Sequence, residues 1–206
     1  MIDTRIWQPV LAALDEWRGA GLRAPLWLRD DDAVAPSPSL DRLVSLTERF
    51  GIPLALAVVP AMAGETLAAR LAPLHHVTPI VHGWIHKNHA PADQKKQEFG
   101  PHRPLDVMEN ELSSGLQKMD VLFGDRFTPM FVPPWNRIAP ELAQRLAPIG
   151  YTALSTFGRG RGAIEVPVIN THVDIIDFRG ARRCRDHREL ADGLADALRH
   201  SLGHDR

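Results

Sequence analysis

The sequence predicts an α/β fold built on a parallel sheet or barrel, and three observations support this class. Short apolar runs alternate with amphipathic helical stretches along the chain. Several apolar runs end abruptly in polar or charged residues, which is typical of a buried strand whose carboxyl end reaches solvent. Glycines such as Gly51 and Gly124 follow the helical stretches at the positions where a helix is expected to end.

Local patterns predict each element of the first half. Apolar residues recur at helical spacing from Ile6 to Trp17, which predicts a helix there. After an apolar strand at 25–28, the turn residues Pro36-Ser37-Pro38-Ser39 lead into a second helix, with Ser39 as the expected cap. This second helix is expected over 40–47. The elements that follow it are a strand over 53–59, a helix over 66–74 and a strand over 77–81.

The second half continues this alternation after a long polar loop at 90–104. We expect helices over 105–123, 140–148 and 190–202, and strands over 129–132, 151–154 and 166–169. Residues 170–178 place several polar groups in a stretch that otherwise has a β pattern. Because no shift in composition marks a boundary, we expect a single domain over residues 1–206.

Composition limits the classes of partner. The formal net charge of −1 gives no general attraction to nucleic acid or to an acidic membrane, so neither partner is expected. The single cysteine, Cys184, excludes an intramolecular disulfide and a cysteine-based zinc site. The first residues lack the pattern of a signal peptide, and the apolar stretch at 52–64 is too short to span a bilayer. We therefore expect a cytoplasmic protein, and nothing in the sequence indicates its oligomeric state.

Polar side chains follow four of the apolar runs, at the strand ends where parallel α/β folds bind ligands. The four groups are Asp30-Asp31-Asp32, the pair His82 and His86, Pro133-Pro134-Trp135-Asn136, and the stretch 170–178 with His172 and Asp174. Adjacent carboxylates repel unless a cation or hydrogen-bond donors offset their charge, and two histidines four residues apart can chelate one ion if the stretch is helical. Taken alone, each group also has an ordinary explanation: a solvated turn, packed histidines, a rigid loop around a tryptophan, or a surface strand.

In their order and character the four groups resemble the motifs of the polysaccharide deacetylase superfamily (NodB homology, carbohydrate esterase family 4). The resemblance extends from residue 27 to residue 178, and it is strongest to a bacterial subgroup with Asp-Asp-Asp, His-Gly-Trp-x-His and Pro-Pro-Trp-Asn. It implies a single-domain, distorted (β/α)7 barrel. The matching segments are Asp31-Asp32-Ala33, His82-Gly83-Trp84-Ile85-His86, Val132-Pro133-Pro134-Trp135 and Asp174-Ile175-Ile176-Asp177-Phe178. For the first motif, Asp30-Asp31 is a second possible register.

The resemblance implies a metal-dependent hydrolase that removes acetyl groups from N-acetylated or O-acetylated sugars and acts on non-peptide carbon–nitrogen bonds. Asp32, His82 and His86 would hold a divalent cation, with Zn²⁺ expected first and Co²⁺, Ni²⁺ or Mn²⁺ also compatible. Asp31 would be the general base, and the backbone N–H of Trp135 would stabilise the oxyanion. Substrate contacts are expected from Asp30, Arg103, Pro134 and Asn136.

The chain departs from the family pattern in ways that change these expectations. Val132 stands where the family has an arginine, so we expect Arg103 or Arg29 to orient Asp31 or Asp174 instead. The family's C-terminal Leu-x-His motif is not found, which predicts either His172 as the general acid or a C-terminus that lacks the last strand. The lack of a signal peptide favours a small intracellular acetylated sugar or another small amide as the substrate.

Three further alternatives remain open at this stage. The first is a non-catalytic relative that binds a metal or a carbohydrate, and the second is a metal-free barrel in which the histidines merely pack. The third is an amide hydrolase of the same fold that acts on small cyclic amides, because substrate choice depends on loops such as 94–104 and 157–162.

Overall fold

The computed structural model describes residues 4–160, 164–178, 180 and 183–204. Contacts between Cα atoms divide the chain into two compact units. One unit, here called the sheet unit, is residues 27–170. The other, here called the helix-pair unit, combines the segment before residue 27 with the segment after residue 170.

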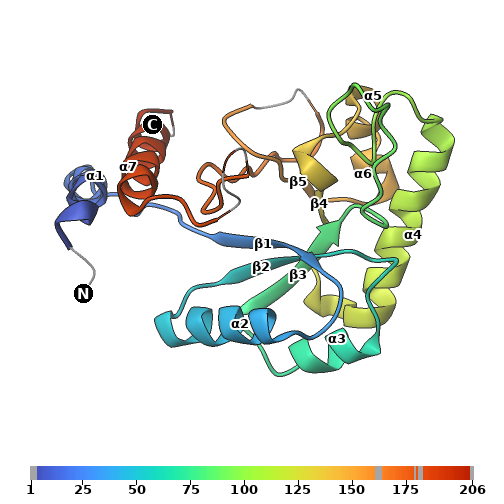
Figure 1. The fold of residues 1–206 in the computed structure, drawn as a ribbon, viewed down its shortest axis with the longest axis horizontal. Coiled ribbons are helices and arrows are strands. Elements are labelled where there is room, and N and C mark those ends of the chain that lie inside the picture. The colour runs from blue at the N-terminus through green and yellow to red at the C-terminus, as the bar shows by residue number, and fades with distance from the viewer. Residues whose placement is uncertain (1–3, 161–163, 179, 181–182, 205–206) are drawn as a thin grey trace. The chain divides into compact units, whose positions relative to one another are not determined.

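The sheet unit is built on parallel strands that follow one another in chain order (Figure 1). Over the described residues the sheet consists of β1 (Leu28–Ala33), β2 (Leu54–Val58), β3 (Val77–His82), β4 (Met130–Val132) and β5 (Ala153–Leu154). All four pairings are parallel, with His82 opposite Val132 between β3 and β4. The carboxyl ends of all five strands therefore lie along one edge of the sheet.

Helices lie around these strands in the sheet unit (Figure 1). They are α2 (Pro38–Phe50), α3 (Glu65–Leu71), α4 (Leu105–Phe123), α5 (Pro140–Ala143) and α6 (Leu146–Ile149), with short 3-10 turns at Gly124–Arg126 and Pro134–Asn136. The buried apolar residues of strands and helices form one core cluster. Phe131 lies at the centre, where its ring meets the rings of Phe99 and Tyr151 edge to face at 5.5 and 5.3 Å.

The helix-pair unit consists of a short 3-10 turn (Thr4–Trp7), α1 (Gln8–Gly19) and α7 (His187–His204). The two helices share a separate apolar core that includes Val10, Trp17, Ala195 and Leu198. The indole N–H of Trp17 donates a hydrogen bond of 2.9 Å to the carbonyl of Leu198, which satisfies a buried polar group.

The predicted fold class is confirmed: the structure is α/β with a parallel sheet. The helix expected over 105–123 has those bounds, and the glycine after it ends the helix as expected. The helix expected over 140–148 is interrupted between α5 and α6. The strand expected over 166–169 is reduced to an isolated parallel bridge between Leu154 and Val168, and within the stretch 170–178 Ile176 forms an antiparallel bridge with Cys184.

The expected cap of the second helix is wrong by two residues. Ser37, not Ser39, is the N-cap of α2, and its hydroxyl accepts a hydrogen bond of 3.1 Å from the backbone N–H of Leu40. The reason is Pro38, whose fixed φ and missing N–H suit the first position of a helix, so the helix begins there. Among the described residues no helix is both long and apolar enough to cross a membrane.

Core packing along α4 can be tested with a matched pair of substitutions. Leu112 is 0% exposed in the main core, whereas Val121 on the same helix is 81% exposed. We expect Leu112→Ala to lower the free energy of unfolding by about 2–5 kcal/mol, because it removes buried methyl groups and leaves a cavity. Val121→Ala should change it by less than about 0.5 kcal/mol. Urea denaturation measures both, and similar losses in the two variants would contradict the described packing.

Candidate metal centre

Three of the residues predicted as metal ligands converge at the carboxyl edge of the sheet. Asp32 lies at the end of β1, His82 ends β3, and His86 follows four residues later. The Nε2 atoms of His82 and His86 lie 3.0 and 3.2 Å from Oδ1 of Asp32. Asp32 is exposed, His82 is buried, and His86 is partly buried, so the group opens to solvent on the side of the carboxylate.

His82 is held by its second ring nitrogen. Its Nδ1 lies 2.9 Å from the carbonyl oxygen of Val132, the residue opposite it on β4. Because a carbonyl oxygen can only accept, Nδ1 carries the proton, and in the neutral ring the lone pair is on Nε2, which faces Asp32. A backbone acceptor of this kind commonly fixes the tautomer and the orientation of a metal-binding histidine.

His86 reaches the same point without a helix. The stretch from Gly83 to His86 is irregular, and His86 has a φ of +56°, in the left-handed region that few non-glycine residues adopt. Its ring lies against that of Trp135, with centroids 4.4 Å apart. An irregular loop therefore brings the two histidines together, and the helix considered for residues 82–86 does not form.

Backbone strain is concentrated at this site. Over the described residues, the non-glycine residues with positive φ are Asp32, His86, Trp135 and Asn136, and all four belong to the predicted site. Such conformations cost free energy and persist only where surrounding contacts hold them, and they cluster at functional sites. This independent observation supports a binding role for the strand ends.

The donor set fits a divalent cation. One carboxylate oxygen and two imidazole nitrogens lie within 4.8 Å of one another. Around a tetrahedral ion with bonds of about 2.0–2.2 Å, neighbouring ligand atoms are separated by about 3.3–3.5 Å, close to the separations between Asp32 and the two histidines. When Nε2 also carries a proton, His82 donates to Asp32, and this hydrogen bond lowers the pKa of Asp32. A bound cation would take the place of that proton beside the same ionised carboxylate.

Val132 stands where the deacetylase family has an arginine, and Arg29 supplies a guanidinium to Asp31 instead. Its side chain is 5% exposed, with Nε 2.9 Å from Oδ1 of Asp31 and Nη2 donating to Oδ2 at 3.0 Å. The same guanidinium donates to Oδ1 of Asn136 at 3.0 Å and to the hydroxyl of Ser155 at 2.8 Å. The buried guanidinium of Arg29 therefore links residues at the ends of β1, β4 and β5, and it orients Asp31, the predicted general base.

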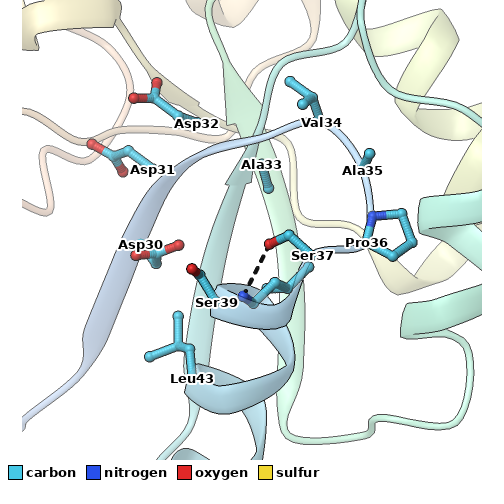
Figure 2. A pocket seen from close by; sticks show the side chains of 11 residues that line it. Asp30, Asp31, Asp32, Ala33, Val34, Ala35, Pro36, Ser37, Ser39 and Leu43 are labelled. Atoms are coloured by element: carbon cyan, nitrogen blue, oxygen red, sulfur yellow. Dashed lines mark hydrogen bonds between the residues drawn. The ribbon is translucent and has the colours of Figure 1, made fainter.

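Asp30 lies apart from the other two carboxylates. Figure 2 shows its side chain on the side of Ser39 and Leu43, while Asp31 and Asp32 project from the opposite side of the β1 ribbon. The pocket there has a volume of about 380 Å³ and is lined by residues of β1, of the following loop and of α2. Burial, and then the charges of Asp31 and Asp32, raise the pKa of Asp30 to about 6.

The remaining predicted residues divide between the two units. Pro134, Trp135 and Asn136 form the turn after β4 in the sheet unit. Arg103 is also in this unit, where its guanidinium pairs with Glu111 at 2.7 and 2.8 Å. Arg29, of the two arginines considered, is thus the one that contacts Asp31.

His172 and Asp174 belong to the helix-pair unit, where Oδ1 of Asp174 accepts a hydrogen bond of 3.0 Å from the N–H of Ile176. Their roles remain predictions from the sequence.

Two residues of the site were missed by sequence reasoning. Ser155 follows the short strand β5, and its place directly after an apolar run was the one signal that pointed to it. Glu98 is fully buried, and its carboxylate accepts hydrogen bonds from the loop that contains His86. Nothing in its local pattern marks Glu98 as buried, because it lies within a polar loop.

Comparisons with known proteins agree with this geometry at the level of the fold. No protein-family model matches the sequence, and no match is found among curated proteins. Among solved structures, the chain is similar to IcaB from Ammonifex degensii, with a TM-score of 0.63, 12% identity, and coverage of 94% of this chain and 88% of that one. It is also similar to the Streptococcus pyogenes deacetylase PplD, with a TM-score of 0.55, 15% identity, and coverage of 79% and 70%.

The chain has the polysaccharide deacetylase fold. The deacetylase fold is a distorted (β/α)7 barrel, as the resemblance implied, and the parallel sheet of this chain is part of it. A family 4 acetyl xylan esterase from Clostridium thermocellum is also similar, with a TM-score of 0.46, 16% identity, and coverage of 64% of this chain. This chain spans 56% of that esterase.

Gly83 provides a test of the loop geometry within the deacetylase fold. It has a φ of +60°, and a Cβ there would overlap Oε2 of Glu98 and lie 2.5 Å from Cγ of Pro134. Gly51, at the end of α2, has a φ of +63° but nothing within 4 Å of such an atom. Both Gly→Ala variants therefore incur the left-handed backbone cost of about 1–2 kcal/mol, and only Gly83→Ala adds a collision.

We expect Gly83→Ala to unfold at a clearly lower temperature than Gly51→Ala in a thermal scan monitored by circular dichroism. Equal shifts in the two variants would show that the space at Gly83 is not as tightly filled as described.

Proposed function

We propose that this chain is a divalent-metal-dependent hydrolase that removes acetyl groups from N-acetylated or O-acetylated sugars. The observation that carries the proposal is the convergence of Asp32, His82 and His86 beside a second carboxylate, Asp31, that a buried arginine orients. A cation site and an adjacent base are the two parts that hydrolysis of an amide or ester needs. The PplD structure, which shares the fold, was solved in complex with acetate, a product of such a reaction.

Asp32, His82 and His86 would hold the cation, for which Zn²⁺ is the first expectation. When bound, a cation of this class would polarise a carbonyl and lower the pKa of water to about 7. His82 contributes a rigid ligand, because its ring is fixed by β3 and by the Val132 carbonyl. Asp32 remains exposed, which leaves the centre accessible from solvent.

Asp31 would take the proton from the attacking water. It is 31% exposed, and Arg29 contacts both of its oxygens. The ion pair fixes the direction of the carboxylate, so that it can act as a base beside the cation. Asn136 and Ser155 hold the other side of the guanidinium and prevent it from turning toward the substrate.

The turn after β4 would complete the site. Trp135 has a left-handed backbone and lies against the ring of His86, and its N–H is assigned to the oxyanion that forms during hydrolysis. Asp30, Arg103, Pro134 and Asn136 are assigned to substrate binding; of these, Asp30 borders the pocket beside α2. No step is assigned to His172 or Asp174.

Metal dependence and base catalysis can be tested together. We expect the purified chain to bind one equivalent of Zn²⁺ or Co²⁺ and to release acetate from N-acetylglucosamine oligomers or simple acetanilides. Asp31→Asn should keep the cation and lose activity by about 10²–10⁴-fold, the range for a general base. Asp125→Asn, an exposed aspartate of the same unit, is the control.

The measurements are metal content by elemental analysis and acetate release by a coupled assay. A chain that binds no cation would refute the proposal. A chain that binds the cation and releases no acetate would instead be a binding relative, and turnover of small cyclic amides would identify the other amide hydrolase class.

The role of Arg29 predicts a second result. Arg29→Lys keeps a cation near Asp31 but loses the second nitrogen contact, and Arg29→Met loses both contacts. We expect kcat to fall in the order wild type, Lys, Met, with Co²⁺ affinity changed by less than about threefold because Arg29 does not contact the ligands. Arg145→Met, which removes the partner of Glu109 outside the site, should leave kcat close to wild type. Wild-type kcat in Arg29→Met would contradict the assignment.

A further inference from the structure

Glu98 is a buried carboxylate in an unusual setting. It is 0% exposed, although it lies in the polar loop between β3 and α4. Among its described contacts the carboxylate meets backbone N–H groups, and the nearby arginine, Arg103, donates to the backbone carbonyl of Glu98 at 3.1 Å. A buried charge of this kind is costly unless hydrogen bonds replace its lost hydration, so its partners indicate its role.

Those partners all belong to the loop that contains His86. The backbone N–H groups of Ile85 and Lys87 donate to Oε1 at 2.8 and 3.4 Å, and the N–H of Trp84 donates to Oε2 at 3.2 Å. Residues 84–87 lie outside any helix or strand, so the backbone N–H groups of Trp84, Ile85 and Lys87 need partners other than a helix or a sheet. One side chain therefore satisfies a segment of backbone on both sides of His86.

The residue that follows Glu98 is anchored in the core. Phe99, directly after Glu98, is 0% exposed and packs edge to face on Phe131. Its carbonyl accepts a hydrogen bond of 2.7 Å from the N–H of Ala139, and its backbone forms a parallel bridge with Ile138. The core thus holds the backbone next to Glu98, and the carboxylate of Glu98 in turn holds the loop that contains His86.

Gly83 shows how closely the two parts fit. The space that a side chain would fill at this position is occupied by Oε2 of Glu98 and the ring of Pro134. Burial raises the pKa of Glu98, and the three backbone hydrogen bonds offset part of that rise. The left-handed backbone of His86 lies between two of the residues that Glu98 holds.

We propose that Glu98 is a positioning residue for the cation: its carboxylate holds the loop 83–87 so that the His86 ring faces Asp32 and His82. The inference rests on the proposed cation site, which it deepens by assigning one of its supports. Glu98 touches neither the cation nor the substrate in this assignment, and acts through His86 alone.

Glu98→Gln tests the assignment with almost no change in shape. An amide has one accepting oxygen, whereas the carboxylate uses both of its oxygens, so at least one loop N–H then faces an NH2 group. We expect Co²⁺ affinity to fall about 10- to 100-fold, the range for losing a residue that orients a metal ligand. Glu109→Gln on α4, which removes a partly exposed carboxylate paired with Arg145, is the matched control and should bind Co²⁺ as wild type does.

A double-mutant cycle separates positioning from a general loss of stability. Co²⁺ affinity is measured by calorimetry or visible absorption for wild type, Glu98→Gln, His86→Ala and the double variant. If Glu98 acts through His86, Glu98→Gln costs no further affinity once His86 is absent. Wild-type affinity in Glu98→Gln, or the same loss with and without His86, would overturn the proposal.

Two other outcomes are also decisive. If Glu98→Gln does not fold, Glu98→Asp keeps the charge but shortens its reach, and an unchanged Co²⁺ affinity in that variant would overturn the proposal. If the wild-type chain binds no Co²⁺, the proposed function itself fails and this assignment fails with it. Binding by wild type with no effect at Glu98 would remove only the assignment.

Discussion

Parallel pairing of β1 through β5 is the constraint from which the candidate centre follows. It brings the ends of strands that are distant in the sequence to one edge of the sheet, and the register between β3 and β4 sets His82 opposite Val132. That register also supplies the carbonyl that fixes the imidazole. A slip of one residue on β3 would turn His82 to the other face of the sheet and would remove both the ligand and its support.

Two buried charged side chains organise what the strands bring together, and they do so in different ways. Arg29 uses its planar fork to join side chains from three strand ends, and its charge is balanced by Asp31. Glu98 instead accepts from backbone N–H groups, so it holds the backbone of a loop and orients the His86 side chain only through that loop. Removal of either residue would leave buried polar groups without these partners, which costs free energy.

The sequence predicted the parts of the fold that depend on local pattern. The long helix α4 has the predicted bounds because its apolar spacing and the glycine after it act locally. The proposed ligands Asp32, His82 and His86 could be named because they follow apolar runs, and the structure brings one ligand atom of each within 4.8 Å of the others. The order of motifs, rather than any one motif, carried the resemblance to the deacetylases.

Other features depend on tertiary contacts that no local pattern reveals. Glu98 is buried because the next residue, Phe99, packs in the core. The polar sequence of the loop does not predict this packing. The choice of Arg29 over Arg103 as the partner of Asp31 depends on where Glu111 lies in space. The strand expected over 166–169 pairs at a single position, so its apolar composition overstated its length.

The left-handed residues Asp32, His86, Trp135 and Asn136 set a relation between stability and activity in this molecule. Each such conformation costs on the order of 1–3 kcal/mol, against a typical total of about 5–15 kcal/mol for a domain. A selection for thermal resistance alone would therefore favour glycine at these positions, which relieves the backbone but deletes a ligand or a contact of the site. The strained residues of the site are thus also the ones that selection for stability alone would replace first.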